Sequence, residues 1–289
     1  MKLSVIIVTY HSMRLIKDCI DSLLRYNSLP EGQLEIIVVD NSSEEEGEKL
    51  KKFLIQTYGG LVRFIKNENL GYGHGNNVGI RAATGNIIGI MNPDVRLTEP
   101  LFDRVEHHFF DQETVSVGFQ QKNGSTDYSF FIKPEYFLPV VSSIKLKRAN
   151  KQQNFDAKKY YLSGALVFFR KKDMEEAGLY DEAIFMYFEE PDIAHRLAKH
   201  GKKTIFDPSR SYFHMIEVKD EYNIKLLDIG TQSIKIYFRK YGFDLKKYIK
   251  LRLLELKIYK LYFWLTGNKL RSEMAAAYTN SLRTLIDEK

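Results

Sequence analysis

The sequence predicts an α/β fold, in which a mostly parallel central sheet is flanked by helices. Three observations support this prediction. Short apolar runs rich in Val and Ile alternate with segments of helical spacing over residues 4–91. Gly and Pro residues punctuate this alternation at its turns. Polar side chains gather directly after the apolar runs, at the positions where open α/β sheets bind their ligands.

The composition is that of an ordinary globular protein. The chain has 289 residues, of which 44% are hydrophobic and 28% charged, enough for one large domain with an appendage. Cys19 stands alone, so no disulfide can form within the chain, which suits a reducing compartment. No apolar run reaches 18 residues, and residues 2–8 lead directly into a strand. We therefore expect a cytoplasmic protein without a spanning helix.

The first strand and helix follow from local patterns. Residues 4–10 are apolar and β-branched, which predicts a strand. Ser12 is placed to cap the helix over residues 13–24, where apolar side chains recur at helical spacing. After the loop at residues 30–32, residues 34–39 form the second predicted strand.

The next two units repeat the pattern. Ser43 and Glu46 have the spacing of a capping box, so a second helix begins there and runs towards Tyr58. Residues 62–66 form the third strand. Residues 67–77 are rich in Gly and Asn and predict a loop that leads into a helix ending near residue 85.

The fourth strand, residues 87–91, ends at Asn92-Pro93-Asp94. Proline cannot continue a central strand, so the chain leaves the sheet there. Asp94 then lies just beyond the carboxyl end of a buried strand. Two interpretations fit this carboxylate: it holds a divalent cation that in turn holds a phosphate, or it is a turn residue without a ligand.

The second half is less regular, and from about residue 221 onwards it reads as helical. Residues 133–159 are basic and polar, without clear periodicity, and predict a mobile loop. The other predicted elements are helices over residues 98–110 and 172–177, a helix beginning at 189–191, and strands over residues 115–121, 128–132, 161–169, 204–206 and 211–214.

Glu189, Glu190 and Asp192 place three carboxylates within four positions. Pro191 suits the first turn of a helix, so acidic charge there would stabilise the helix without any further function. However, the aromatic run at residues 185–188 predicts partial desolvation, which raises the pKa of a carboxylate towards that of a general base. We therefore favour catalysis for this cluster.

Other candidates are weaker when taken alone. The spacing of Gly71, Gly73 and Gly75 is neither that of a dinucleotide site nor that of a P-loop, so we expect these glycines to let the loop fold tightly beside a ligand. His214 could reach the sheet edge that carries Asp94, but an isolated histidine is poor evidence of a metal.

The ordered set of motifs over residues 3–216 resembles the family 2 glycosyltransferases of the inverting GT-A fold, and within them the rhamnosyltransferase-like branch that builds bacterial surface polysaccharides. The motifs that carry this resemblance are Val8-Thr9-Tyr10, Val38-Val39-Asp40-Asn41-Ser42-Ser43, Asn69-Leu70-Gly71-Tyr72-Gly73 with Asn76 and Gly79, Asn92-Pro93-Asp94, Ser163-Gly164-Ala165, Gly178-Leu179-Tyr180-Asp181-Glu182, and the Glu-Glu-x-Asp-x-x-x-Arg run from Glu189 to Arg196.

The resemblance implies a role for each matched residue. Glu190 would be the catalytic base, with Glu189 as the alternative and Asp192 beside them. Asp94 would hold Mg²⁺ or Mn²⁺ at the donor diphosphate, together with His214. Asn92 stands where the family's first acid would be, so the donor's own phosphates would complete the shell of the cation. The nucleotide and donor would contact Thr9, Tyr10, Asp40, Asn69, Gly71, Tyr72, Asn76 and Asn92, and the acceptor or donor sugar would contact Ser163, Gly164 and Arg196, which can also pair with Asp192.

The implied reaction moves a sugar, such as rhamnose, from a dTDP- or UDP-sugar to a hydroxyl of a glycan or lipid-linked acceptor, with inversion. Two other classes compete with this hypothesis. A non-catalytic module on the same fold would bind a nucleotide sugar or glycan without turnover. A nucleotidyltransferase would need a Gly-rich, Lys-bearing N-terminal loop, which we do not find in the sequence.

The C-terminal region, residues 219–289, is predicted as a basic helical extension to the GT-A domain of residues 1–218. Residues 235–271 carry 11 Lys and Arg against two acids, so the rest of a chain of net charge +6 is slightly acidic. This local charge argues against a nucleic-acid partner. Lys246, Lys250, Lys257 and Lys260 fall on one helical stripe, which fits an anionic membrane surface on the inner face of the cell membrane. Helix-mediated homodimerisation would use the same surface.

Overall fold

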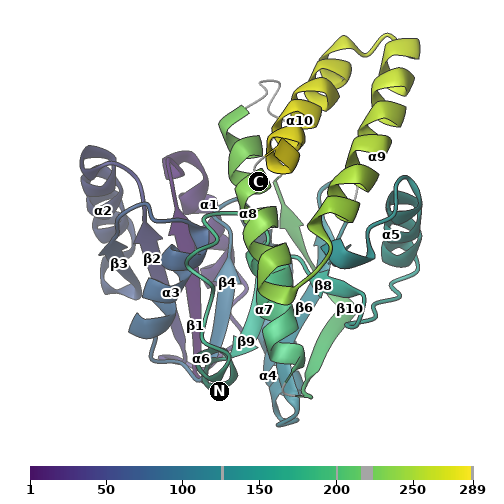
Figure 1. The fold of residues 1–289 in the computed structure, drawn as a ribbon. Helices are drawn as coiled ribbons and strands as arrows, with labels where there is room; N and C mark the ends of the chain where they lie inside the picture. The colour runs from purple at the N-terminus through teal and green to yellow at the C-terminus, as the bar shows by residue number, and fades with distance from the viewer. Residues whose placement is uncertain (125–126, 200, 216–223, 288–289) are drawn as a thin grey trace.

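The computed structural model describes residues 1–124, 127–199, 201–215 and 224–287. Within them, an eight-stranded sheet runs through the molecule in the order β3-β2-β1-β4-β9-β6-β10-β5 (Figure 1). Its strands, in chain order, are β1 (Leu3–Thr9), β2 (Leu34–Asp40), β3 (Val62–Lys66), β4 (Ile87–Met91), β5 (Val95–Leu97), β6 (Thr114–Lys122), β9 (Leu166–Arg170) and β10 (Lys203–His214). The predicted α/β architecture, with its mostly parallel sheet and flanking helices, is confirmed.

The N-terminal half is a parallel unit. Strands β1, β2, β3 and β4 pair in parallel, and the helices α1 (Met13–Arg25), α2 (Glu44–Tyr58) and α3 (Tyr72–Ala82) connect them. Strands β1 and β4 are buried along their whole length, because helices cover both faces of the sheet. Ser43 caps α2 as predicted, whereas the Ser12 side chain makes no cap and instead donates to the carbonyl of Tyr10.

The glycine-rich segment differs from the predicted loop, because α3 already begins at Tyr72. Gly71 precedes it with φ 114°, and a Cβ there would stand 2.4 Å from the Phe185 carbonyl oxygen. A Cβ on Gly79 would stand equally close to Ile6. These two glycines therefore let protein segments approach one another closely, and the expectation that the loop folds beside a ligand stays a prediction.

The second half mixes strand directions. Strand β9 runs antiparallel between β4 and β6, while β10 runs parallel to β6 with an irregularity between Asp207 and Ser211. The two short strands predicted over residues 204–206 and 211–214 are therefore one long strand. The single strand predicted over residues 161–169 is instead two strands, β8 (Tyr160–Leu162) and β9, separated by residues 163–165. Strand β8 pairs with β7 (Phe130–Ile132).

The predicted mobile loop over residues 133–159 is largely ordered. It contains the 3-10 turn η2 (Pro134–Tyr136) and the helix α5 (Val141–Lys151). Near the end of α5, the buried Asn150 side chain donates to the Phe130 carbonyl and accepts from the Ser129 backbone, which ties the helix to β7. The remaining elements of this half are η1 (Gly59–Leu61), α4 (Phe102–Phe109), α6 (Lys171–Glu176) and α7 (Glu189–Ala198).

Three C-terminal helices stand together at the upper right of Figure 1: α8 (Ile224–Tyr241), α9 (Leu245–Leu265) and α10 (Lys269–Asp287). They share an apolar cluster that includes Tyr237, Phe238 and Leu282, and Phe137 and Phe188 of the preceding region pack against it. The predicted boundary at 218–219 falls within residues 216–223, outside the described part of the chain.

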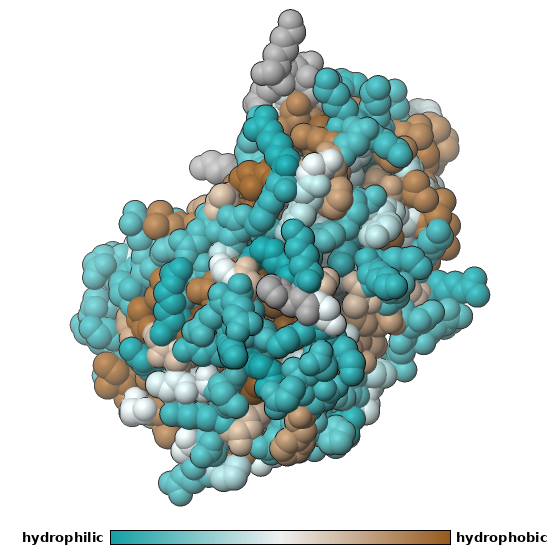
Figure 2. All heavy atoms as spheres, turned by 60° about the horizontal axis from the view of Figure 1, so that its bottom comes forward, coloured by the Kyte–Doolittle hydropathy of each residue, from teal (hydrophilic) through white to brown (hydrophobic). Residues whose placement is uncertain are grey.

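The end of the molecule that is lowest in Figure 1 comes forward in Figure 2, where hydrophilic residues predominate and hydrophobic ones gather towards the upper right. No helix among the described residues combines the length and the apolar character that crossing a membrane requires.

Candidate active site

Asp94 and His214 meet at the sheet edge that follows β4. The chain turns at Asn92, and Asp94 Oδ1 then lies 3.2 Å from His214 Nε2, at the end of β10. This contact joins residues 120 positions apart, because β10 and β5 pair antiparallel and bring their ends together. The structure thus brings the two predicted metal residues to one point.

The donor set fits a divalent cation. Asp94 Oδ1 and His214 Nδ1 are buried and have no hydrogen-bond partner. A carboxylate suits Mg²⁺ or Mn²⁺, and a neutral imidazole suits Mn²⁺ and its neighbours better than Mg²⁺. In the described part of the chain, no cluster of three or more His, Cys, Asp or Glu could enclose an ion. A cation here would need ligands from a bound donor, as the sequence predicts.

The Asn92 side chain already has a protein partner, and its predicted contact with the donor stays a prediction. Its Oδ1 accepts a hydrogen bond of 2.8 Å from the Tyr72 hydroxyl on α3. The Asn92 backbone carbonyl accepts from the Cys19 thiol. Asn92 therefore links β4 to α1 and α3, and its side chain fixes the direction of the Tyr72 phenol.

Glu189 and Glu190 stand at the start of α7, behind two residues of unusual backbone conformation. Tyr187 and Phe188 have φ of 68° and 71°, a region in which side chains other than Gly are strained. Glu189 is buried, and its Oε2 has no hydrogen-bond partner. Glu190 lies against Gly164, where a Cβ would stand 2.5 Å from Glu190 Oε1. The β8–β9 break therefore leaves the room that the Glu190 carboxylate occupies.

Burial shifts the pKa of both glutamates upward. Desolvation raises the pKa of Glu189, and the nearby charge of Glu190 raises it further. Desolvation also raises the pKa of Glu190. The Tyr72 phenol has a raised pKa as well, first through burial and then through the charges of Glu190, Glu189 and Asp94. The charges of Glu189, Glu190 and Asp94 all act on the Tyr72 phenol, so these three carboxylates lie in one electrostatic neighbourhood around it.

A second group of predicted residues surrounds Asp40 at the end of β2. Its Oδ1 accepts from the hydroxyls of Thr9 and Ser42, at 2.9 and 2.8 Å. Its Oδ2 is buried without a hydrogen-bond partner, and Lys66 Nζ lies 4.0 Å away. A cavity of about 670 Å³ opens beside this group, lined by Tyr10, His11, Asn41, Ser42, Ser43, Glu44, Lys66, Asn67, Glu68 and Asn69. Its size lies within the range of small-molecule sites.

Asp192 and Arg196 pair on α7, as the sequence predicts. The guanidinium Nε and Nη2 donate to Asp192 Oδ2 at 2.9 and 2.7 Å, and Nη1 donates to the Ala177 carbonyl. Asp192 Oδ1 accepts from the Tyr241 hydroxyl at 2.8 Å and lies 2.7 Å from Lys240 Nζ. The fully buried Asp192 thus anchors α8 to α7.

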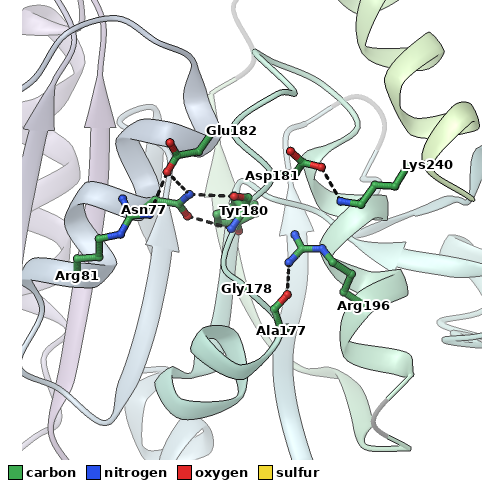
Figure 3. Close-up of a pocket in the computed structure, with 9 residues that line it drawn as sticks. All are labelled: Asn77, Arg81, Ala177, Gly178, Tyr180, Asp181, Glu182, Arg196 and Lys240. Atoms are coloured by element: carbon green, nitrogen blue, oxygen red, sulfur yellow. Dashed lines mark hydrogen bonds and ion pairs between the residues drawn. The ribbon is translucent and has the colours of Figure 1, made fainter.

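Figure 3 shows the cavity of about 400 Å³ beside this anchor, where Asp181 faces Lys240 and Arg196 reaches Ala177. Each guanidinium nitrogen of Arg196 already has a protein partner. The assignment of Arg196 to the donor or acceptor sugar stays a prediction.

Two further predicted residues hold protein segments together. Ser163 donates to Gln121 Oε1 at 2.9 Å, which fixes the β8–β9 break to β6. Asn76 donates to the Tyr72 carbonyl and leaves its own Oδ1 buried without a partner. Sequence reasoning missed Lys66, whose Nζ donates to the carbonyls of Asp40, Ser42 and Asn67. Its position at a strand end was the available signal.

The sequence matches known proteins over most of this region. The model of glycosyl transferase family 2 matches residues 4–178. The uncharacterized glycosyltransferase EpsJ of Bacillus subtilis (strain 168) is 29% identical over 133 residues, which make up 46% of this chain and 37% of EpsJ. Rhamnosyltransferase WbbL of Escherichia coli (strain K12) is 25% identical over 215 residues, covering 69% of this chain and 78% of WbbL. The match thus spans little more than a third of EpsJ but most of WbbL.

Solved structures share the fold at low identity. A mannosyltransferase from Pyrobaculum calidifontis, PcManGT, in complex with GDP-Man and Mn²⁺, superposes with a TM-score of 0.65 at 17% identity and covers 100% of this chain and 88% of its own. GalNAc-T7 with UDP, GalNAc and Mn²⁺ gives a TM-score of 0.58 at 15% identity and covers 83% and 49%, respectively. At these identities the likeness establishes the arrangement of sheet and helices alone.

Proposed function

The chain belongs to glycosyl transferase family 2 and has the GT-A type of fold, and on this premise we propose that it transfers a sugar from a nucleoside diphosphate to an acceptor hydroxyl with inversion. The observation that carries the proposal is the pair of the buried Glu189 and the half-buried Glu190, whose pKa values desolvation raises, in the same electrostatic neighbourhood as Asp94. Titratable groups whose pKa is shifted by their surroundings are typical of acid–base sites.

Glu190 acts as the base of the reaction. Its carboxylate takes the proton of the acceptor hydroxyl, whose oxygen attacks the anomeric carbon of the donor sugar. The bond from that carbon to the diphosphate breaks, and its electron pair leaves with the nucleoside diphosphate. A raised pKa suits this task, since the carboxylate then holds the abstracted proton more readily near neutral pH. A single displacement inverts the anomeric centre without a protein nucleophile.

The donor lies along the carboxyl ends of β1, β2 and β4. We assign the nucleoside to the cavity lined by Tyr10 and Asn69, above Asp40. Asp94 and His214 would hold Mg²⁺ or Mn²⁺, which offsets the charge that develops on the departing diphosphate. The rhamnosyltransferase relative supports a donor sugar of the rhamnose type. We further propose that the donor is a dTDP- or UDP-sugar and that the transfer serves bacterial surface polysaccharide synthesis.

Turnover of purified protein tests this assignment. With a panel of nucleotide sugars and Mn²⁺ or Mg²⁺, we expect Glu190→Gln to lower the transfer rate by about 10²- to 10⁴-fold, the usual contribution of a general base. Asp94→Ala should weaken the dependence of the rate on the cation. The control is Glu31→Gln, which alters an exposed glutamate in a loop. Wild-type transfer rates in both site variants would refute the assignment.

One observation favours a non-catalytic module on the same fold. Asn92 replaces the acid that the family's metal motif would carry there, and its oxygen is already bonded to Tyr72. Such a module would bind nucleotide sugars tightly and release no nucleoside diphosphate with any acceptor in the panel.

We also propose that the C-terminal helices dock on an anionic membrane surface, on the inner face of the cell membrane. Lys246, Lys250, Lys257 and Lys260 are all exposed on α9. At the free end of the same helix, exposed apolar side chains lie between these lysines and Lys269: Leu261, Tyr262, Trp264 and Leu265. Aromatic and aliphatic side chains flanked by cations suit an anionic lipid interface. A second copy would bring like charges together at this end, which disfavours a dimer there.

A further inference from the structure

A cavity of about 480 Å³ lies between the start of α7 and the C-terminal helices. Its walls come from four parts of the fold: the β7–β8 sheet, the segment before α7, α8 and α10. The lining combines aromatic side chains, aliphatic side chains from α8 and one carboxylic acid, Glu190. The residue assigned above as the base is therefore part of this wall, while Asp94 and Asp40 are not.

We propose that this cavity is the acceptor site and that it takes a sugar hydroxyl carried on an apolar aglycone, such as an alkyl or polyprenyl chain. The inference rests on the proposed function for the role of Glu190, and it adds the site and the chemical class of the second substrate. It also assigns a catalytic purpose to α8 and α10, beyond their packing on the domain.

The chemistry of the walls points to this class. Tyr161, Tyr187 and Phe188 offer aromatic faces close to Glu190, and such faces pack against the C–H surface of a sugar ring. Leu226, Leu227 and Ile234 form the aliphatic part of the wall, which α8 contributes. An unsubstituted glycan would leave these aliphatic side chains exposed to water, whereas an apolar aglycone would cover them.

The acidic pair lies close to this aromatic wall. Burial raises the pKa of the Tyr161 phenol, and the charges of Glu190 and Glu189 raise it further. The strained backbone of Tyr187 and Phe188 aims both rings at the cavity edge and sets the start of the helix that carries Glu190. Strain of this kind is retained where a site requires it.

The polar cavity of Figure 3 is a poorer acceptor site. Its cations already have acidic partners, since Arg81 pairs with Glu182, Lys240 with Asp181, and Arg196 with Asp192. The Glu190 carboxylate is not part of its lining. An acceptor bound there would compete with the ion pairs that hold α7 and α8.

Gly230 allows a direct test, because it lies in a helix and a Cβ there would meet only Tyr187, at an ordinary 3.5 Å. The series Gly230→Ala, Leu and Phe should fill the cavity by steps and favour the helix, so folding is preserved. The matched control is Gly60→Leu, where a Cβ would meet open space outside the site.

The probes are the methyl and octyl glycosides of one sugar, below the micelle concentration, with binding measured by calorimetry in the presence of nucleoside diphosphate and Mn²⁺. We expect the wild type to bind the octyl glycoside at least about tenfold more tightly than the methyl glycoside, a preference worth about 1.4 kcal/mol. The variants Gly230→Leu and Gly230→Phe should lose this preference for the octyl glycoside, while Gly230→Ala and Gly60→Leu should retain it. Nucleotide affinity should stay at the wild-type value throughout.

Equal octyl glycoside affinity in the wild type and Gly230→Phe would overturn the acceptor assignment, as would a wild type that does not distinguish the two glycosides. Neither result would touch the proposed transferase activity, because that is scored by release of nucleoside diphosphate and by the Glu190→Gln variant. If the Gly230→Leu and Gly230→Phe variants lose the glycoside preference but bind the nucleotide normally, the acceptor and the donor bind at separate sites.

Discussion

At the scale of single residues, Glu190 is half-buried and lies against Gly164. Its pKa is raised by desolvation, so its charged form is the costly one in the folded protein. Gly164 has no side chain and so leaves room for the carboxylate, because a Cβ at this position would lie 2.5 Å from Glu190 Oε1. A functional carboxylate held in this way should lower stability in return for chemistry.

Glu190→Gln should therefore stabilise the protein, and more at pH 8 than at pH 5. A group whose pKa is higher in the folded than in the unfolded state stabilises the fold only while it is protonated, so wild-type stability is lost as pH rises through the folded pKa. The glutamine carries no charge, so the variant does not lose this stability as the pH rises. Thermal unfolding at both pH values should show a midpoint gain of about 2 °C or more at pH 8, shrinking at pH 5.

A gain of equal size at both pH values, or a loss at pH 8, would mean that the Glu190 charge is fully compensated in the folded state. Glu31→Gln, on an exposed loop, provides the baseline for the substitution itself.

At the scale of elements, α7 is the junction of the molecule. Its first turn carries the acidic pair, and Asp192 one residue beyond Pro191 anchors α8 through Tyr241 and Lys240. On the same helix, His195 Nε2 lies 2.7 Å from Glu135 of η2, whose other oxygen accepts from Tyr237. The position of Glu190 therefore depends on contacts from η2 and α8 as well as on the sheet.

Asp192→Ala should weaken this junction strongly. The substitution leaves Arg196 and Lys240 without their shared buried partner, and breaking a buried ion pair from one side costs about 3–5 kcal/mol. Urea unfolding should report a lower free energy of unfolding by about that amount. Asp103→Ala is the control, because this exposed carboxylate is 3.9 Å from its nearest arginine and should cost below about 1 kcal/mol.

If Asp192→Ala unfolded like the wild type but lost transfer activity, Asp192 would be a catalytic residue rather than a positioning residue. Nucleotide affinity separates the two further, since the pocket beside Asp40 lies on other elements.

At the scale of the whole molecule, α9 has two different halves. The N-terminal half is packed into the protein, with Tyr248 and Ile249 buried and Glu255 accepting from the Val140 backbone. The C-terminal half exposes its apolar side chains, and Trp264 and Leu265 are 71% and 68% exposed. Removing residues 244–289 would delete the packed half as well and expose the protein surface that it covers, so point substitutions at the exposed end are the sharper test of membrane docking.

Flotation with vesicles that contain an anionic phospholipid should recover the wild type. Serine at Leu261, Trp264 and Leu265 together should abolish this recovery, because both the aliphatic and aromatic contributions are lost. The matched control places serine at Ile55, Leu61 and Phe110, which are comparably exposed on other elements. Purely zwitterionic vesicles should recover less wild-type protein, since lysines contribute through anionic headgroups.

Equal flotation of both triple variants would remove the membrane proposal. A concentration-dependent change in mass by light scattering, lost only in the α9 variant, would instead favour the homodimer.

The sequence by itself determined the parallel half of the fold and the residues at its strand ends. Strand periodicity, a capping box and Asn92-Pro93-Asp94 are local signals, so the βα units and the place of Asp94 could be predicted. The order of α5 and the joining of β10 could not, because both depend on contacts with distant strands.

Only the tertiary structure decided which side chains meet. His214 reaches Asp94 because β10 pairs antiparallel with β5, and Gly71 and Gly73 allow Phe185 and Tyr180 to approach the start of α3. The cavity beside Glu190 needs walls from β7, β8, α8 and α10, whose segments carry no motif in common. The physical reason is that periodicity records which face of an element is buried, whereas a site is made by pairing between elements that only the folded chain brings together.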